Sequence, residues 1–270
     1  MNLAVRVVSG LVLVGVIVAA LWIGTAAVAA VVGAGALIGA WELRGLLGRI
    51  GPTPPPAWLI LPLSVWLGIR FVLPASDMAA DWAFAAAAVI GLLAGLGTRE
   101  RFTGWALAAG GATYVGLCLG FWVAIYRWHP TDSTHLGFRL VILALAGAVI
   151  GDTAAYLVGS AFGRHPFFHS ISPRKSAEGA AAGAIASILV GAIAGPLLIG
   201  ISVPLGAVLG ALTAVAAQGG DLVESAIKRE AGVKDSGTLI PGHGGLLDRA
   251  DSLVLLAPVV YCYLKLIAFP

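Results

Sequence analysis

Long apolar runs cover most of this chain and restrict it to a membrane-spanning fold. Hydrophobic residues fill 59% of the 270 positions, and only 11% of the residues are charged. A soluble domain of this length needs a polar surface, and this sequence has too few polar residues to make one. Because a helix crosses the hydrocarbon core of a bilayer with about 20 apolar residues, we expect an all-α, polytopic bundle of transmembrane helices.

Apolar stretches of suitable length predict about nine spans. They cover residues 3–23, 25–41, 57–73, 79–96, 104–126, 138–162, 177–199, 203–218 and 253–269. Only Gly24 separates the first two stretches. Since the apolar sequence resumes after the first stretch, we interpret that stretch as a retained span rather than a cleaved signal peptide.

Basic residues are unevenly distributed between the predicted loops. With a cytoplasmic amino terminus, twelve of the 16 lysines and arginines lie on the inner side. Cytoplasmic loops carry such an excess, so we expect residues 163–176 and 221–251 to face the cytoplasm from the inner (plasma) membrane. We divide the chain into N-terminal scaffold helices (1–135), which also offer oligomer contacts, and a C-terminal catalytic region (136–270).

Charged residues concentrate between Asp221 and Asp251. These 31 positions hold ten of the 29 charged residues. Charges close to hydrocarbon are costly unless they bind one another, a metal ion or a charged ligand. On a helix, Asp221, Ser225 and Lys228 share one face at i, i+4 and i+7 with Glu224 beside them, although an amphipathic helix end explains this face equally well.

A second acidic face follows the glycine-rich turn 241–245, where Asp248 and Asp251 are three residues apart. Carboxylates from two helices are oxygen ligands of the kind that Mg²⁺ prefers. Asp221 and Asp248 are the leading metal ligands, and Asp251 and Asp152 are weaker candidates. Asp152 lies inside an apolar stretch, where it binds metal or substrate or makes a polar contact within the bundle.

Cations are interleaved with these carboxylates. Lys228, Arg229, Lys234 and Arg249 suit a polyphosphate bridged by metal ions. Glycine amides at 242, 244 and 245 can approach a phosphate closely, although a tight turn explains these glycines equally well. His243 either shapes the loop or donates to a phosphate.

The segment 172–179 is the other polar region on the predicted inner side. Ser172, Lys175 and Ser176 precede an apolar helix, whose exposed amides attract anions. It is not a Walker A loop, because His169 and Arg174 occupy positions that this motif reserves for glycine. The inner-side excess of basic residues accounts for Arg174 and Lys175 as well as catalysis does.

These segments resemble a known family, the phosphatidate cytidylyltransferases or CDP-diacylglycerol synthases. The resemblance covers about fifteen specified positions among the 27 residues from Ser225 to Asp251, and a further polar region from Asp152 to Gly179. Ala250 and Ser176 depart from it, since the family more often has a larger residue or threonine there. The first half of the chain resembles the family only in hydropathy.

The resemblance implies transfer of CMP from CTP to phosphatidate, which yields CDP-diacylglycerol and pyrophosphate. It implies required Mg²⁺ and allows K⁺ beside it. Catalytic roles fall on Asp221, Asp248, Lys228, Arg229 and Lys175. Contacts to CTP or lipid phosphates fall on Ser172, Lys175, Ser176, Ser225, Lys228, Arg229, Lys234, His243, Gly244 and Arg249.

Two alternatives remain open. An ion-coupled transporter would also bury carboxylates such as Asp152 and interrupt its spans with glycine. A related enzyme would use CTP on another lipid phosphate, such as an unsaturated archaeol phosphate. Membrane lipids are expected partners and nucleic acid is not, and a homodimer is compatible with the sequence although no residue requires it.

Overall fold

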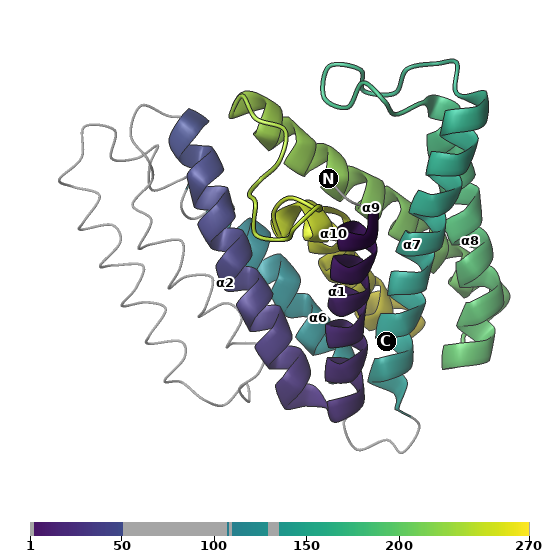
Figure 1. Cartoon of the computed structure of the whole chain (residues 1–270). Coiled ribbons are helices and arrows are strands. Elements are labelled where there is room, and N and C mark those ends of the chain that lie inside the picture. Colours follow the sequence, from purple (N-terminus) through teal and green to yellow (C-terminus); the bar gives the residue numbers. More distant parts are fainter. Residues whose placement is uncertain (1–2, 51–106, 108–109, 129–134, 270) are drawn as a thin grey trace. The chain divides into compact units, whose positions relative to one another are not determined.

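The computed structural model describes residues 3–50, 107, 110–128 and 135–269, and these residues are almost entirely helical (Figure 1). The elements are α1 (Leu3–Ile23), α2 (Thr25–Ile50), η1 (Thr113–Leu117), α6 (Cys118–Tyr126), α7 (Leu136–Phe162), α8 (Ala177–Ile199), α9 (Val203–Glu230), α10 (Leu247–Tyr263) and η2 (Leu264–Ala268). Within the described ranges, extended pairing is limited to two isolated bridges. The predicted all-α class is confirmed for this part of the chain.

Five helices are long and apolar enough to cross a membrane, which makes this a multi-pass membrane protein. They are Thr25–Ile50, Leu136–Phe162, Ala177–Ile199, Val203–Glu230 and Leu247–Ala268, with two shorter apolar helices at Val7–Ile23 and Gly110–Tyr126. The predicted spans 57–73 and 79–96 lie outside the described residues, as does the beginning of 104–126. The total of nine spans and the cytoplasmic amino terminus stay predictions.

Three helices extend beyond the apolar stretches that predicted them. α2 continues past residue 41 to Ile50, α9 continues past residue 218 to Glu230, and α10 begins at Leu247 rather than at residue 253. The length of an apolar stretch predicts only the part of a helix that lies in hydrocarbon. The helix itself continues through Glu, Lys, Arg and Leu, because these residues are good helix formers. Asp221, Lys228 and Asp248 therefore lie on helix ends, whereas Lys175 and His243 lie in loops.

One compact unit comprises Met1–Ala124 and Ile227–Ala250. In it, α1 and α2 are joined by Gly24, whose φ of 125° is in the region that L side chains rarely adopt. Gly39 of α2 lies against side chains of Val115 and Leu247. Residues 227–250 thus lie in the same compact unit as α1 and α2. The division into N-terminal scaffold helices (1–135) and a C-terminal catalytic region (136–270) stays a prediction.

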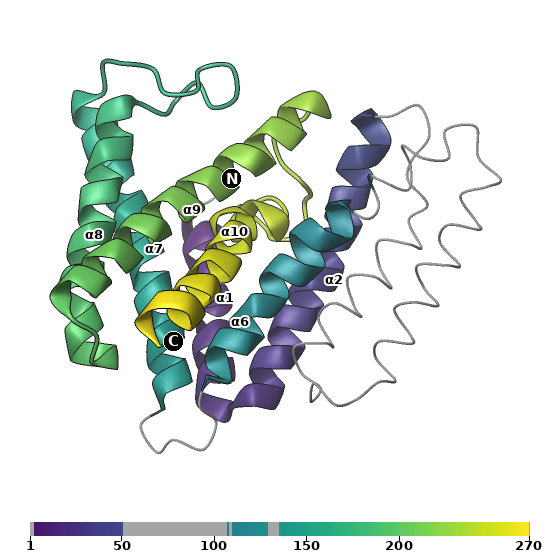
Figure 2. The same cartoon turned by 180° about the vertical axis from the view of Figure 1, so that it is seen from behind.

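The other unit comprises Ile125–Ala226 and Asp251–Pro270. Here α7 and α8 lie side by side along their length (Figures 1 and 2). Gly151 of α7 approaches Gly183 and Ser187 of α8 so closely that a Cβ atom would overlap the Ser187 hydroxyl. Gly191 and Gly206 make a similar approach between α8 and α9. Such small residues allow helices to pack tightly in lipid.

Side-chain hydrogen bonds link the helices of this second unit. Ser187 Oγ donates to the Gly147 carbonyl at 2.9 Å, and Gln218 Nε2 donates to the Ala180 carbonyl at 3.1 Å. The Tyr263 hydroxyl donates to the Leu205 carbonyl at 2.7 Å. Polar groups among apolar helices need such partners, so these bonds help to define how α7, α8, α9 and α10 pack.

Substituting one of two glycines on α9 tests this close packing. A Cβ at Gly210 would overlap backbone atoms of Ser187 and Ile188, whereas a Cβ at Gly219 would meet nothing within 4 Å. We expect Gly210→Ala to lower stability by about 1–3 kcal/mol through overpacking. Gly219→Ala should be neutral or stabilising by up to about 1 kcal/mol. Thermal unfolding in detergent measures both, and equal midpoints would contradict the α8–α9 contact.

Candidate functional site

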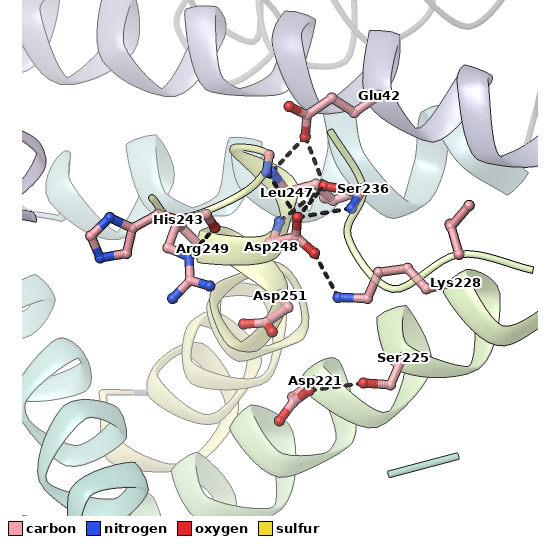
Figure 3. A network of polar contacts seen from close by, with 12 residues as sticks. Glu42, Asp221, Ser225, Lys228, Ser236, His243, Leu247, Asp248, Arg249 and Asp251 are labelled. Carbon is pink, nitrogen blue, oxygen red and sulfur yellow. Dashed lines mark hydrogen bonds and ion pairs between the residues drawn. The ribbon is translucent and has the colours of Figure 1, made fainter. Parts of the chain in front are cut away.

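Asp248, the second residue of α10, is the centre of a buried polar network (Figure 3). Its Oδ1 accepts from Lys228 Nζ at 2.7 Å, and the two side chains are only 5% and 10% exposed. Its Oδ2 accepts from the Ser236 amide at 2.8 Å, the Ser236 hydroxyl at 3.0 Å and the Gly245 amide at 2.8 Å. A carboxylate offers about four lone-pair positions, and donors at both oxygens compensate for the burial of Asp248.

Local backbone geometry brings Lys228 and Asp248 together. At the end of α9, Val233 N donates to Lys228 O at 2.9 Å and Gly232 N donates to Arg229 O at 3.0 Å, with Gly232 at φ 68°. This is a Schellman motif, which ends a helix and turns the chain away. Arg229 Nη1 adds a bond to the Val233 carbonyl at 3.1 Å.

A second turn precedes α10 and contains the predicted glycines. Gly242 and Gly244 have φ values of 82° and 85°, and Ile240 N donates to the Gly244 carbonyl at 2.8 Å. These conformations favour the tight-turn interpretation of Gly242 and Gly244. The Gly245 amide is bound to Asp248. A phosphate contact at Gly244 stays a prediction.

Sequence reasoning missed Glu42, which belongs to the same network from α2 (Figure 3). Its carboxylate accepts from the amides of Leu246 and Leu247 at 2.9 and 2.8 Å and from the Ser236 hydroxyl at 3.0 Å. The residue is 8% exposed. One signal was available, because Glu42 is the sole acidic residue among the first 76 positions of the sequence and directly follows the apolar stretch 25–41.

A second cluster, in the other unit, brings together several predicted residues. Lys175 Nζ lies 2.7 Å from Asp221 Oδ2, and Ser225 Oγ donates to Asp221 Oδ1 at 3.1 Å. The charges of Asp221 and Lys175 both act on the Asp152 carboxylate. The Lys175 and Asp221 side chains are 27% and 34% exposed. This cluster is more open to a ligand than the one around Asp248.

The loop that presents Lys175 is held by its own hydrogen bonds. Ser176 caps α8 by accepting from the Gly179 amide at 3.2 Å, and Lys175 N donates to the Ser172 carbonyl at 3.1 Å. Glu178 accepts from the Arg164 amide at 3.1 Å and contacts His165 Nδ1 at 2.5 Å. In this structure Ser172 and Ser176 thus shape the loop, and their predicted substrate contacts stay predictions.

The remaining predicted residues lie around these two clusters. His243 Nδ1 lies 2.8 Å from Ser9 Oγ of α1, which favours the loop-shaping interpretation of His243. Arg249 Nε donates to the His243 carbonyl at 3.2 Å. Asp251 Oδ1 accepts from the Ser252 amide at 2.6 Å. Arg229, Lys234 and Arg249 are exposed, as expected of groups that could meet a phosphate from solvent.

The carboxylates of these clusters suit a hard cation whose other ligands are water and phosphate oxygens of a bound molecule. Within the described ranges, no group of three or more His, Cys, Asp or Glu side chains could hold a metal ion. Mg²⁺ does not need such a group, because it often binds one or two carboxylates together with water and substrate phosphates. Asp221, with the Asp152 carboxylate in electrostatic range, fits this requirement. At Asp248, a metal ion would compete with Lys228.

The buried Lys228–Asp248 pair predicts a specific pattern of stability changes. We expect Asp248→Asn to destabilise the protein by about 3–5 kcal/mol, because it removes the buried carboxylate charge that pairs with Lys228. Adding Lys228→Met removes the opposite charge as well and should recover part of the loss. Thermal unfolding of the two single variants and the double variant measures the coupling. If the losses of the two single variants simply add in the double variant, the pair is not coupled.

The sequence of this chain is similar to those of several known proteins. The cytidylyltransferase family matches residues 4–267. Phosphatidate cytidylyltransferase 5, chloroplastic, of Arabidopsis thaliana is 36% identical over 285 residues, which cover 95% of this chain and 69% of the relative. The phosphatidate cytidylyltransferase of Synechocystis is 41% identical over 168 residues, 60% of this chain and 55% of the relative. The uncharacterized protein YnbB of Escherichia coli is 39% identical over 164 residues, 61% of this chain and 52% of the relative. Just over half the length of these two bacterial relatives is thus aligned. Because the family matches residues 4–267, the chain belongs to the cytidylyltransferase family.

Proposed function

We propose that this protein transfers CMP from CTP to phosphatidate and releases pyrophosphate. The observation that carries the proposal is the family match over residues 4–267, which includes the whole polar run from Asp221 to Asp251. Relatives from a plant and a cyanobacterium are named phosphatidate cytidylyltransferases. The half-exposed Lys175–Asp221 pair supplies charges of the kind that bind phosphates and metal ions.

The proposed reaction is an attack by a phosphate oxygen of the lipid on the α-phosphorus of CTP. A new P–O bond forms, the bond from the α-phosphorus to the oxygen bridging the β-phosphorus breaks, and pyrophosphate leaves with the bonding electrons. Since the lipid phosphate is already ionised near neutral pH, the reaction needs no strong general base. Its main obstacle is repulsion between two anions.

The chain's own cations reduce this repulsion in the proposed mechanism. Lys175 is half-exposed, so its ammonium group can bind a phosphate while it also contacts Asp221. Lys228 is enclosed beside Asp248, and it contributes fixed positive charge. Exposed Arg229, Lys234 and Arg249 attract the triphosphate from solvent. Positive groups that are already in place stabilise the charge that develops on the leaving pyrophosphate.

A divalent cation completes the proposal. Asp221 and Asp152 are the carboxylates whose exposure and surroundings fit Mg²⁺, while Asp248 and Asp251 stay predicted ligands, with K⁺ as the other predicted cation. When bound, Mg²⁺ would neutralise phosphate charge and act as a Lewis acid. We place the reaction at the cytoplasmic face of the inner membrane, where phosphatidate keeps its acyl chains in hydrocarbon. A homodimer also remains part of the proposal.

Lipid labelling tests the proposed reaction directly. Purified protein in detergent, supplied with radiolabelled CTP, phosphatidate and Mg²⁺, should produce labelled lipid and an equal amount of pyrophosphate. Leaving out Mg²⁺ should stop both. Label appearing only with an archaeol phosphate would favour the related acceptor, and absence of pyrophosphate release with every lipid phosphate would contradict the enzyme. An ion-coupled transporter would show its activity only in sealed vesicles.

Asp221→Asn tests the assignment of the half-exposed cluster. Because this change removes a charge that balances Lys175 and is proposed to bind Mg²⁺, we expect transfer to fall by at least about 100-fold. The thermal midpoint should change little, since the Asp221 side chain is 34% exposed. Glu230→Gln, an exposed carboxylate at the end of the same helix, is the matched control and should keep its activity. Full transfer by a folded Asp221→Asn variant would refute the assignment.

A further inference from the structure

The segment between α9 and α10 contains irregular backbone, yet it carries the amides and the hydroxyl that bind Asp248. Backbone groups at the start of a helix have no partners within that helix. For α10, two of these groups, the amides of Leu246 and Leu247, are bound by Glu42. Glu42 is 204 and 205 residues away from them in sequence. A side chain from α2 therefore caps the helix that carries Asp248.

Ser236 connects Glu42 to Asp248. Its hydroxyl lies 3.0 Å from Glu42 Oε2 and also 3.0 Å from Asp248 Oδ2, and its amide donates to Asp248 at 2.8 Å. Figure 3 shows Ser236 between the two carboxylates, with Lys228 reaching Asp248 from the other side. The arrangement of Asp248 and Lys228 thus depends on contacts that begin at Glu42.

Two glycines leave room for the Glu42 carboxylate. A Cβ atom at Gly237 or at Gly245 would collide with its oxygens. Gly245 is not among the residues with positive φ. Close approach by Glu42 and Ser236, rather than backbone conformation, therefore accounts for glycine at position 245.

Negative charge at Glu42 matters as well as shape. A carboxylate can accept from all three donors, and it also interacts favourably with the positive end of the α10 dipole. A glutamine of the same size has one acceptor oxygen, and its amide group would face backbone N–H groups that also donate. Glu42→Gln should therefore weaken the hydrogen bonds at the start of α10, although it preserves the side-chain volume.

We propose that Glu42 is a positioning residue for the cytidylyltransferase reaction. By binding the start of α10 and the Ser236 hydroxyl, it holds Asp248 and Lys228 in the arrangement that the reaction uses. The proposal rests on the proposed function, in which Asp248 and Lys228 take part. Glu42 itself contacts neither substrate nor metal in this proposal.

Hydrogen exchange tests the structural half of the proposal without any substrate. In purified full-length Glu42→Gln, we expect amide exchange at residues 244–248 to be at least about 10-fold faster than in the unsubstituted protein, because the local opening becomes easier. Amides within α8 should exchange as before. The matched control is Glu230→Gln, which removes an exposed carboxylate and should leave exchange at 244–248 unchanged.

Turnover tests the functional half. With lipid labelling measured well below the unfolding midpoint, kcat of folded Glu42→Gln should fall by about 10-fold or more, as is common for residues that orient a site from outside it. Glu42→Asp keeps the charge and should recover part of this loss. If Glu42 acts through Ser236, adding Ser236→Ala to Glu42→Gln should reduce kcat by less than about threefold further.

Distinct outcomes separate this proposal from the proposed function. Unchanged exchange at 244–248 in Glu42→Gln would overturn the inference, and so would faster exchange with unaltered kcat. An unsubstituted protein that transfers nothing to phosphatidate would overturn the proposed function, while the exchange measurement would still decide whether Glu42 holds the segment. Should Glu42→Gln fail to fold, Ser236→Ala alone must show faster exchange and reduced kcat for the inference to stand.

Discussion

Carboxylates that are buried among apolar helices must be matched by hydrogen-bond donors, and this requirement organises the polar end of the protein. Glu42 accepts from two backbone amides, Asp248 accepts from Lys228 and two backbone amides, and the Ser236 hydroxyl lies within hydrogen-bond distance of both carboxylates. Irregular backbone close to hydrocarbon is stable only when its polar groups are satisfied. Because Ser236 serves both carboxylates, the turn between α9 and α10 is fixed by side chains from distant parts of the chain rather than by its own sequence alone.

Asp221 and Asp248 resemble each other in sequence, since each has further polar residues three and four positions later on its helix, but their surroundings differ. Asp248 is 7% exposed and bound to an ammonium group and two backbone amides, whereas the Asp221 side chain is 34% exposed and shares its oxygens with Lys175 and Ser225. An open ion pair can exchange one partner for a phosphate or a metal ion at modest cost. An enclosed pair resists such exchange, because either charge left alone is strongly unfavourable. This difference makes Asp221 the more suitable point for ligand binding and gives Asp248 a role in holding its segment.

Much of the helical framework could be predicted from hydropathy. The predicted stretch 177–199 coincides with α8, and 138–162 falls within α7. Helix ends were harder to predict, as α9 shows by continuing through the charged residues that follow Gln218. Of the site, the grouping of Asp221 with Ser225 follows from helical spacing, since the two are one turn apart. Lys175 could be placed near Asp221 only by the packing of α7, α8 and α9.

By itself, the sequence predicted a membrane protein that is all-helical, as the described residues are, with many of its charged residues near helix ends, because apolar run length and helical spacing are local properties. It also determined the family, through the residues from Ser225 to Asp251. Only the tertiary structure decided which donors each carboxylate receives. Glu42 shows why: its partners lie 194 to 205 residues away, and no local pattern specifies a hydrogen bond that depends on how separate helices pack.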